Sequence, residues 1–249
     1  MRTSLMVIMF ALQAVAQTNK DFVQKQFFPA TVLLYSGDEK GGMDMRCTAT
    51  AIEKDKDSYV FVSAAHCACA DDADKKTVSP EKKDFYVTAD TVGEKVYIPA
   101  KVTACGYRHR GDDFALLKAE TKSEFTTVPL GDDPETMDEI INVGGPLGLG
   151  KLVLTGSVSS AKLDRPIHDD DIDWQGAVAL QEFGVNGGSS GSAVVCMSQH
   201  KICAFVVGSI GQTTMTAMPV SRLKAMQKAY ADKTYTWWVS DPDQAPKPH

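Results

Sequence analysis

The sequence lacks an excess of basic residues. It holds 26 Lys and Arg against 32 Asp and Glu, which gives a formal net charge of −6. Proteins that bind nucleic acid or anionic membrane surfaces through their charge are usually basic. We therefore expect no nucleic-acid partner, and no membrane partner once an N-terminal export signal is removed.

Internal repeats are absent, and helical periodicity is almost absent. Only one stretch has apolar side chains at helical spacing, with Ser221 as N-cap and the helix running from Arg222 to Ala231. Elsewhere short apolar or β-branched runs alternate with glycine-rich and charged turns, a pattern typical of an all-β sandwich or barrel. The expected strands are residues 30–35, 47–52, 58–63, 85–88, 95–98, 101–104, 113–118, 140–143, 151–159, 177–181, 193–195 and 204–208.

Three segments carry no strand or helix pattern. Residues 17–27 are polar with scattered aromatics and predict a surface arm, and the charged residues 70–83 predict a solvated loop. Residues 119–136 are polar, contain two prolines and predict a connection between two β units. The expected organisation is one β unit over residues 17–120, a second over 121–235, and a flexible tail over 236–249.

Residues 1–16 are typical of a secretory signal. Arg2 supplies a positive start, residues 5–12 are apolar, and Ala14-Val15-Ala16 has the small-x-small form of a cleavage site. An uncleaved anchor or a buried strand is the alternative, but the apolar run is short for a membrane span. We expect a mature chain that begins near Gln17 and is secreted or periplasmic.

The six cysteines are even in number and follow this signal, which suggests disulfides. Cys196 and Cys203 flank a polar tip between two apolar strands, so a hairpin disulfide is the simple interpretation. A zinc site is the alternative for the other cysteines, because thiolates and imidazole are zinc ligands, but thiolates suit a reducing compartment better. Its candidate ligands are His66, Cys67, Cys69 and Cys105. We expect disulfides here, and no metal or cofactor.

A serine loop precedes one of the last strands. Asn186 to Val195 reads N-G-G-S-S-G-S-A-V-V, with three serines among three glycines before an apolar run. Glycines let such a loop turn its backbone N–H groups into one concavity, which suits an oxyanion, and a serine there could attack a carbonyl. Taken alone, the loop could equally be a flexible Gly/Ser turn.

A nucleophilic serine needs a histidine base and a carboxylate that orients it. Of the five histidines, only His66 ends a strand in an apolar, small-residue setting. Asp113 opens an apolar strand, where a buried carboxylate needs a partner. Asp112 is its rival, but neighbours in a strand face opposite sides, so only one of them can reach the histidine. A packed histidine beside a disulfide is the simpler alternative for His66.

Three short boxes resemble the catalytic boxes of trypsin/chymotrypsin-fold serine proteases, in that family's order. They are Ser63-Ala64-Ala65-His66-Cys67, Asp113-Phe114-Ala115-Leu116-Leu117 and Gly188-Ser189-Ser190-Gly191-Ser192. Residues 144–150, 155–159 and 213–220 are similar to the second barrel of HtrA-like proteases. The resemblance covers roughly residues 29–230.

The resemblance implies two six-stranded antiparallel β-barrels and a short C-terminal helix. His66 and Asp113 would come from the first barrel, and Ser190 from the second. It further implies a secreted serine endopeptidase that acts on proteins or peptides through an acyl-enzyme, with the N–H groups of Gly188 and Ser190 as the oxyanion hole. Cys47 would pair with Cys67, which leaves Cys69 for Cys105.

Departures from the family pattern limit what can be carried over. Ser192 stands where a glycine is usual, as in glutamyl-endopeptidase-like relatives. No basic residue followed by an Ile/Val-Val-Gly-Gly motif lies near the start, so activation by a new N-terminus is not expected. We also expect no PDZ module after the protease domain. A catalytically inactive binding protein on the same fold is the alternative function.

Specificity is the least determined property. By resemblance, the pocket would be formed around Gly184 in the segment before the serine loop and by Ser209, Ile210 and Gly211. No acid stands where it would bind Lys or Arg, so apolar or small side chains are expected at the cleaved position. A glutamate preference through Thr213 and Thr214 is the rival. The oligomeric state is undetermined.

Overall fold

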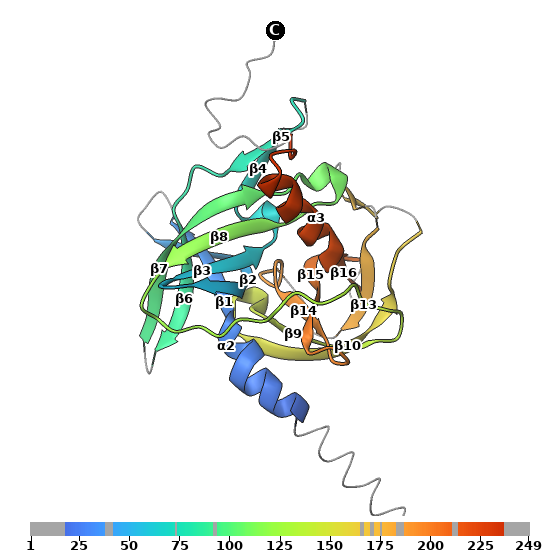
Figure 1. The fold of residues 1–249 in the computed structure, drawn as a ribbon, viewed down its shortest axis with the longest axis horizontal. Coiled ribbons are helices and arrows are strands. Elements are labelled where there is room, and N and C mark those ends of the chain that lie inside the picture. The colour runs from blue at the N-terminus through green and yellow to red at the C-terminus, as the bar shows by residue number, and fades with distance from the viewer. Residues whose placement is uncertain are drawn as a thin grey trace, which may run out of the picture.

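The computed structural model describes residues 18–37, 42–72, 74–91, 94–164, 167–169, 172–174, 176–182, 187–210 and 214–236. They form two closed six-stranded antiparallel barrels that lie side by side (Figure 1). The expected all-β, two-barrel fold is therefore confirmed. None of the helices in the described part of the chain is long and apolar enough to cross a membrane.

The first barrel has the strand order β1-β2-β3-β8-β7-β6. Its long strand β7 places alternate residues inside the barrel, with Ile98, Ala100, Val102 and Ala104 buried and the residues between them exposed. A chain with this alternation can bury one face of a curved sheet and leave the other in water. The strands are β1 (Thr31–Gly37), β2 (Met43–Asp55), β3 (Ser58–Ser63), β6 (Phe85–Thr91), β7 (Glu94–Cys105) and β8 (Ala115–Glu120).

The second barrel has the strand order β10-β13-β16-β15-β14-β9. The hairpin β14–β15 follows the serine loop, and the disulfide Cys196–Cys203 joins its two strands near the tip, as expected. The strands are β9 (Glu139–Gly144), β10 (Leu152–Ser160), β13 (Val178–Glu182), β14 (Ala193–Cys196), β15 (Lys201–Ile210) and β16 (Thr214–Pro219).

One of the hydrophobic clusters joins the two barrels. It combines Val62 of the first barrel with Val143, Ala193 and Phe205 of the second. Phe114, which follows Asp113, belongs to this cluster, and its ring meets that of Phe205 edge-on at 6.0 Å between centroids. The residue beside Asp113 is thus anchored in the interface between the barrels.

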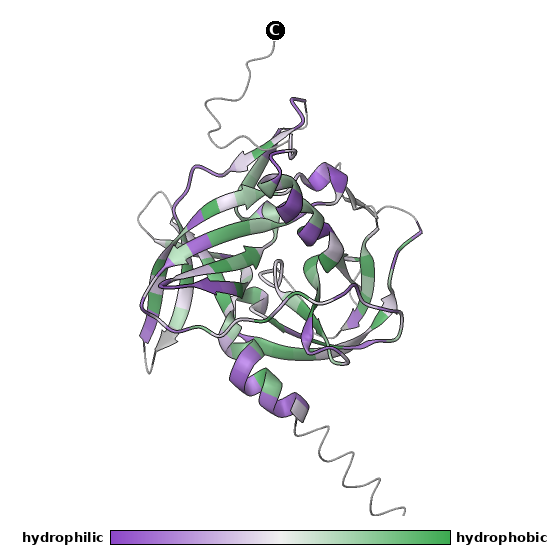
Figure 2. Ribbon diagram, in the orientation of Figure 1, coloured by the Kyte–Doolittle hydropathy of each residue, from purple (hydrophilic) through white to green (hydrophobic). Residues whose placement is uncertain are grey.

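The N-terminal arm predicted over residues 17–27 is wrong. Residues 18–30 are helical, including η1 (Val23–Phe27) and α2 (Phe28–Ala30), and Figure 2 shows the hydrophilic and hydrophobic sides of this segment. Val23, Phe27 and Ala30 are buried at spacings of four and three residues, which is a helical face. Pro29 lies next to the end of this helical run, and β1 begins two residues later at Thr31, close to the strand start expected at residue 30.

The loop predicted over residues 70–83 is also wrong in part. It contains the hairpin β4 (Cys69–Asp72) and β5 (Thr77–Pro80), in which Ala70 pairs with Ser79. The hairpin buries Val78 and is tied to β7 by the disulfide Cys69–Cys105. The disulfide and one buried side chain thus order this hairpin, although its charged composition predicts a loop. A second short hairpin, β11 (Ile167–Asp169) and β12 (Ile172–Trp174), packs near Arg108–Arg110.

The predicted C-terminal helix exists as α3 (Val220–Ala231), but its N-cap is Pro219 and not Ser221. The Ser221 hydroxyl instead donates to the Asp133 carboxylate at 2.6 Å. Val220, Leu223 and Met226 are buried, and Leu223 and Met226 attach the helix to the cluster between the barrels. Helix α3 therefore belongs to the second barrel in sequence but reaches the first in space (Figure 1).

Candidate active site

His66 and Asp113 are brought together in the first barrel. His66 lies in the single turn η2 (Ala65–Cys67) that follows β3, and Asp113 lies just before β8, which pairs with β3. Asp113 Oδ2 is 2.7 Å from His66 Nδ1, and the backbone N–H of His66 donates to Asp113 Oδ1 at 3.0 Å. The carboxylate is fully buried, whereas 27% of the imidazole side chain is exposed. One carboxylate thus fixes both the ring and the backbone of His66.

The protonation of this pair is set by two opposing effects. Burial lowers the pKa of His66, but the charge and hydrogen bond of Asp113 outweigh it and raise the pKa above its ordinary value of 6.5. Burial likewise raises the pKa of Asp113, but the His66 charge and hydrogen bonds dominate, so this carboxyl has a pKa below 3.8. Asp113 therefore stays ionised at neutral pH and can hold His66 by its Nδ1–H.

Asp112, the rival carboxylate, faces the other way. Its Oδ1 accepts a hydrogen bond from Arg222 Nη2 at 3.0 Å, and its Oδ2 accepts one from the Tyr235 hydroxyl at 3.3 Å. Asp112 therefore points towards α3 and the residues just beyond it, away from His66. Among the described residues, Asp113 is the carboxylate that binds the imidazole.

The serine loop turns sharply because of two glycines in the left-handed region. Gly188 has φ +97°, and a Cβ there would lie 2.6 Å from the carbonyl oxygen of Gly145. Gly191 has φ +79°, and a Cβ there would lie 2.5 Å from the carbonyl oxygen of Thr48. Any side chain at either position would collide with backbone, so only glycine lets this loop pack against its neighbours.

Four consecutive carbonyls of the loop are held by hydrogen bonds. Gly187 O accepts from Leu147 N at 2.7 Å and Ser189 O from Ser192 N at 3.0 Å. Gly188 O accepts from the Thr48 hydroxyl at 2.8 Å and Ser190 O from Thr48 N at 2.9 Å. Within the described part of the chain, the N–H groups of Gly188 and Ser190 donate to no acceptor.

This arrangement fixes the direction of the two N–H groups. In a trans peptide the N–H points opposite to the carbonyl of the preceding residue. Gly187 O and Ser189 O are both engaged, so the N–H groups of Gly188 and Ser190 are held facing away from those bonds. Preorganised donors of this kind can stabilise an oxyanion.

The three serines of the loop have different environments. Ser189 is buried, and its hydroxyl has no hydrogen-bond partner among the described residues. Ser192 is also buried, and its hydroxyl accepts from Asn142 Nδ2 at 2.8 Å. Ser190 is only partly buried. Of the three, Ser190 is thus the one whose side chain a substrate can approach.

Thr48 and Asn142 escaped the sequence analysis. Both are buried polar residues within strands, and both bond the serine loop. Nothing in their local sequence distinguishes them from other strand residues, because their partners lie far along the chain. A polar residue inside an otherwise apolar strand is the only signal that could have directed attention to them.

Ser190 and His66 lie on opposite sides of the junction between the barrels. Thr48, whose N–H binds Ser190 O, follows Cys47, and the disulfide Cys47–Cys67 joins that strand to the residue after His66. Within the described residues, the Ser190 hydroxyl makes no hydrogen bond to the imidazole. Such bonds are often loose without substrate and tighten when it binds.

The residues expected to bind substrate are only partly described. Ser209 and Ile210 end β15, where they pair with Met215 and Thr214 of β16, and 43% of Ile210 is exposed. Gly184 and Gly211 lie outside the described residues.

The cysteines of the alternative zinc site are all bonded in disulfides. Cys67 is bonded to Cys47, and Cys69 to Cys105, so these sulfurs are not free to bind a metal. The pairs are those expected from the resemblance.

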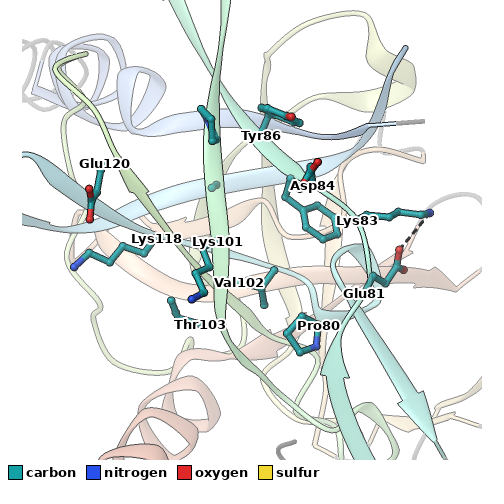
Figure 3. Close-up of a pocket in the computed structure, with 13 residues that line it drawn as sticks. Pro80, Glu81, Lys83, Asp84, Tyr86, Lys101, Val102, Thr103, Lys118 and Glu120 are labelled. Atoms are coloured by element: carbon teal, nitrogen blue, oxygen red, sulfur yellow. Dashed lines mark ion pairs between the residues drawn. The ribbon is translucent and has the colours of Figure 1, made fainter. Parts of the chain in front are cut away.

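A separate surface hollow of about 710 Å³ lies on the outer face of the first barrel. It is formed by residues of β5, β6, β7 and β8 and of the connection between β5 and β6, which carries the ion pair of Lys83 with Glu81 at 3.3 Å (Figure 3). His66, Asp113 and Ser190 are not among its lining residues.

Two closed β-barrels with a buried Asp–His pair and a glycine-rich serine loop define the class of two-barrel serine peptidases. The chain matches the family model of the trypsin-like peptidase domain over residues 47–205. This is more than half of the sequence, so the chain belongs to the trypsin-like peptidase domain family. By family it is a serine endopeptidase.

Solved structures share the fold at low identity. Rv3671c from M. tuberculosis H37Rv, in an inactive form, matches with 14% identity and a TM-score of 0.61, over 85% of this chain and 90% of that one. The HtrA-type protease AlgW with a decapeptide matches with 16% identity and a TM-score of 0.63, over 87% of this chain and 68% of AlgW. The serine endoprotease from Yersinia pestis matches with 18% identity and a TM-score of 0.59, over 86% of this chain and 67% of that one. In another AlgW structure, with a tripeptide, the match spans only 62% of AlgW.

Proposed function

We propose that the chain hydrolyses peptide bonds in proteins or peptides through a Ser190–His66–Asp113 triad and an acyl-enzyme. The observation that carries the proposal is the buried Asp113 carboxylate, which binds both Nδ1 and the backbone N–H of His66. Trypsin-like family membership supports the peptidase class. The partly buried Ser190, on a loop with four consecutive carbonyls engaged, supports its role as nucleophile.

In the first half of the reaction, His66 Nε2 takes the proton of the Ser190 hydroxyl as Oγ attacks the peptide carbonyl. The negative charge on the carbonyl oxygen is stabilised by the N–H groups of Gly188 and Ser190. Asp113 keeps the proton of His66 on Nδ1 and stabilises the imidazolium without becoming protonated itself. The carbon–nitrogen bond then breaks, and His66 protonates the leaving amine.

In the second half, water replaces the amine. His66 takes a proton from that water as it attacks the acyl-enzyme, and the same two N–H groups stabilise the second tetrahedral intermediate. Collapse of this intermediate returns the proton to Ser190 and releases the new carboxyl end. Besides the substrate and water, no further group is required to balance these steps.

Location and specificity belong to the proposal as well. The signal pattern over residues 1–16 and the three disulfides support a secreted or periplasmic enzyme. The exposed Ile210 at the end of β15 supports apolar or small side chains at the cleaved position. The proposed units are residues 17–120 and 121–235.

Labelling with a fluorophosphonate tests the nucleophile without knowledge of the substrate. We expect the wild-type protein to be labelled and to cleave casein, and we expect Ser190→Ala and His66→Ala to lose both properties. Ser189→Ala is the matched control, because it removes the neighbouring hydroxyl, which is buried and has no partner among the described residues. A folded wild-type protein that takes no label would support the inactive binding protein instead. Label that persists in Ser190→Ala would exclude Ser190 as nucleophile.

A further inference from the structure

Thr48 is a buried polar residue that the triad mechanism does not use. It lies on β2 of the first barrel, is fully buried, and follows the disulfide-bonded Cys47. Its hydroxyl donates to Gly188 O at 2.8 Å and accepts from Gly145 N at 2.9 Å. Both partners belong to the second barrel, so the hydroxyl bridges two glycine loops across the junction of the barrels.

The backbone of Thr48 adds two further bonds. Its N–H donates to Ser190 O at 2.9 Å, and its carbonyl accepts from the Ser63 hydroxyl at 2.7 Å. Thr48 therefore holds the carbonyls on both sides of Ser189, and Ser63 in turn holds Thr48. A Cβ at Gly188 would lie 2.6 Å from the carbonyl oxygen of Gly145, so this close approach of the two loops requires glycine at position 188.

We propose that Thr48 is a positioning residue that keeps the oxyanion loop in its active geometry. This inference rests on the proposed function. The peptide after Gly188 is fixed by the Thr48 hydroxyl, and the peptide before it is fixed by Leu147 N. With both neighbouring peptides held, the Gly188 N–H cannot rotate away from the oxyanion. The Thr48 hydroxyl also accepts from Gly145 N, so it connects the loop that carries Leu147 to the carbonyl of Gly188.

The alternative is that the hydroxyl only stabilises the fold. Removing it leaves a carbonyl and an N–H without their partner, which destabilises any protein whether or not the site is affected. The two roles differ in one respect. A positioning role predicts slower reaction of Ser190 at equal stability, whereas a structural role predicts lower stability alone.

The experiment compares Thr48→Val with Thr88→Val in the full chain. Thr88 is a matched control, because it is a buried threonine of the same barrel whose hydroxyl accepts from Leu33 N at 3.2 Å and donates to Leu33 O at 3.5 Å. The readouts are the second-order rate of fluorophosphonate labelling, the rate of casein hydrolysis, and the melting temperature. The phosphoryl oxygen of the probe enters the oxyanion hole, so its rate reports the geometry of the loop.

We expect Thr48→Val to be labelled about 10- to 100-fold more slowly than wild type, less than the ~100- to 1,000-fold cost of losing a donor itself. Thr48→Ser, which keeps the hydroxyl, should label within about threefold of wild type. Thr88→Val should label like wild type although it melts earlier. If Thr48→Val does not fold, Thr48→Ala and Thr88→Ala provide the same comparison without the added methyl group.

Equal labelling rates for the Thr48 and Thr88 variants would overturn the inference. So would a Thr48→Ser variant as slow as Thr48→Val. Failure of the proposed function looks different, because the wild-type protein itself would then remain unlabelled.

Discussion

The Asp113–His66 bond determines how activity should depend on pH. In the proposed mechanism only neutral His66 can accept the serine proton, and Asp113 raises the pKa of His66 above 6.5. We therefore expect kcat/KM to fall as the pH drops, with an inflection above pH 6.5. The positive charges of Arg46 and Arg108 oppose this rise in pKa. A profile of kcat/KM across the neutral range, at constant ionic strength, is the measurement.

Asp113→Asn is the matched variant, because it keeps the shape of the side chain and removes its charge. We expect its kcat to fall about 10⁴-fold, as the orientation and the tautomer of His66 are lost. The residual activity should show an inflection at lower pH than in the wild type. An unchanged inflection would mean that Asp113 does not control the protonation of His66.

The same pair makes the stability of the fold depend on pH, and the contribution of His66 changes in the opposite direction to activity. Because the pKa of His66 is raised on folding, its contribution to stability is fully present below pH 6.5 and is lost as the pH rises through its folded value. The pKa of Asp113 is lowered, so its contribution is present above pH 3.8 and is lost as the pH falls through its folded value. Between pH 6.5 and the folded pKa of His66, the stability that His66 contributes falls while activity rises.

Ser192 should be replaceable by the glycine that the family usually carries. Its hydroxyl accepts from Asn142 Nδ2, but that amide also donates to Ala193 O at 2.8 Å. We expect Ser192→Gly to lower the free energy of unfolding by about 1 kcal/mol, the net worth of one hydrogen bond. The rate of fluorophosphonate labelling should stay close to that of wild type. A large loss of labelling with little loss of stability would instead assign Ser192 a role in the reaction.

At the scale of single residues, sequence patterns are informative where a short box carries the chemistry. Each box around His66, Asp113 and Ser190 is weak alone, and it is the order of the three boxes along the chain that selects these residues as candidates. Thr48 and Asn142 lie in no such box, and their partners lie 140 and 50 residues away. Only folding brings those partners together.

At the scale of elements, the helical segment 18–30 is an integral part of the structure. Phe27 is fully buried in the cluster between the barrels, and Ala30 belongs to the same cluster. We expect Phe27→Ala to lower the free energy of unfolding by about 3–5 kcal/mol, because it leaves a cavity in a packed core. Chemical denaturation of the purified protein measures this loss.

Lys25→Ala is the control within the same segment. Lys25 is exposed and pairs with Asp21 at 2.8 Å on the surface, an interaction worth less than about 1 kcal/mol. Similar losses for the two variants would contradict the assignment of the segment to the core.

The elements that the sequence misjudged share a physical cause. The hairpin β4–β5 has a charged composition, yet one buried valine and the Cys69–Cys105 bond order it. The helical segment 18–30 is polar with scattered aromatics, yet the buried Val23, Phe27 and Ala30 form one helical face. In both cases contacts made after folding decide the local structure, and local composition does not report them.

At the scale of the whole molecule, a barrel pattern could be expected from the strands alone, but the pairing of two closed barrels came from the family resemblance. Alternating apolar residues specify a buried face without specifying which strands meet. The cluster that joins the barrels combines residues from Phe27 to Met226, nearly the whole described chain. Contacts between residues so far apart cannot be predicted from short sequence patterns.

The end of the described chain connects the two barrels near Asp113. The Tyr230 hydroxyl accepts from Cys105 N at 3.1 Å and donates to Cys105 O at 2.7 Å. The Tyr235 hydroxyl accepts from Tyr107 N at 2.8 Å and donates to Asp112, which Arg222 also binds. The two tyrosine rings stack with centroids 4.7 Å apart. The loop that ends in Asp113 is thus held by α3 and the residues that follow it.

Tyr235→Phe should therefore weaken catalysis from a distance. Losing the hydroxyl removes its hydrogen bonds with Tyr107 N and Asp112 Oδ2, which loosens the loop before Asp113 and costs about 1–3 kcal/mol of stability. We expect a lower kcat and a pH inflection shifted below the wild-type value. Tyr59→Phe is the matched control, because its hydroxyl likewise accepts from a backbone N–H, of Phe125, and donates to a carboxylate, of Glu124. It should lose stability and keep the wild-type pH profile, whereas identical profiles for both variants would show that the C-terminal contacts serve folding alone.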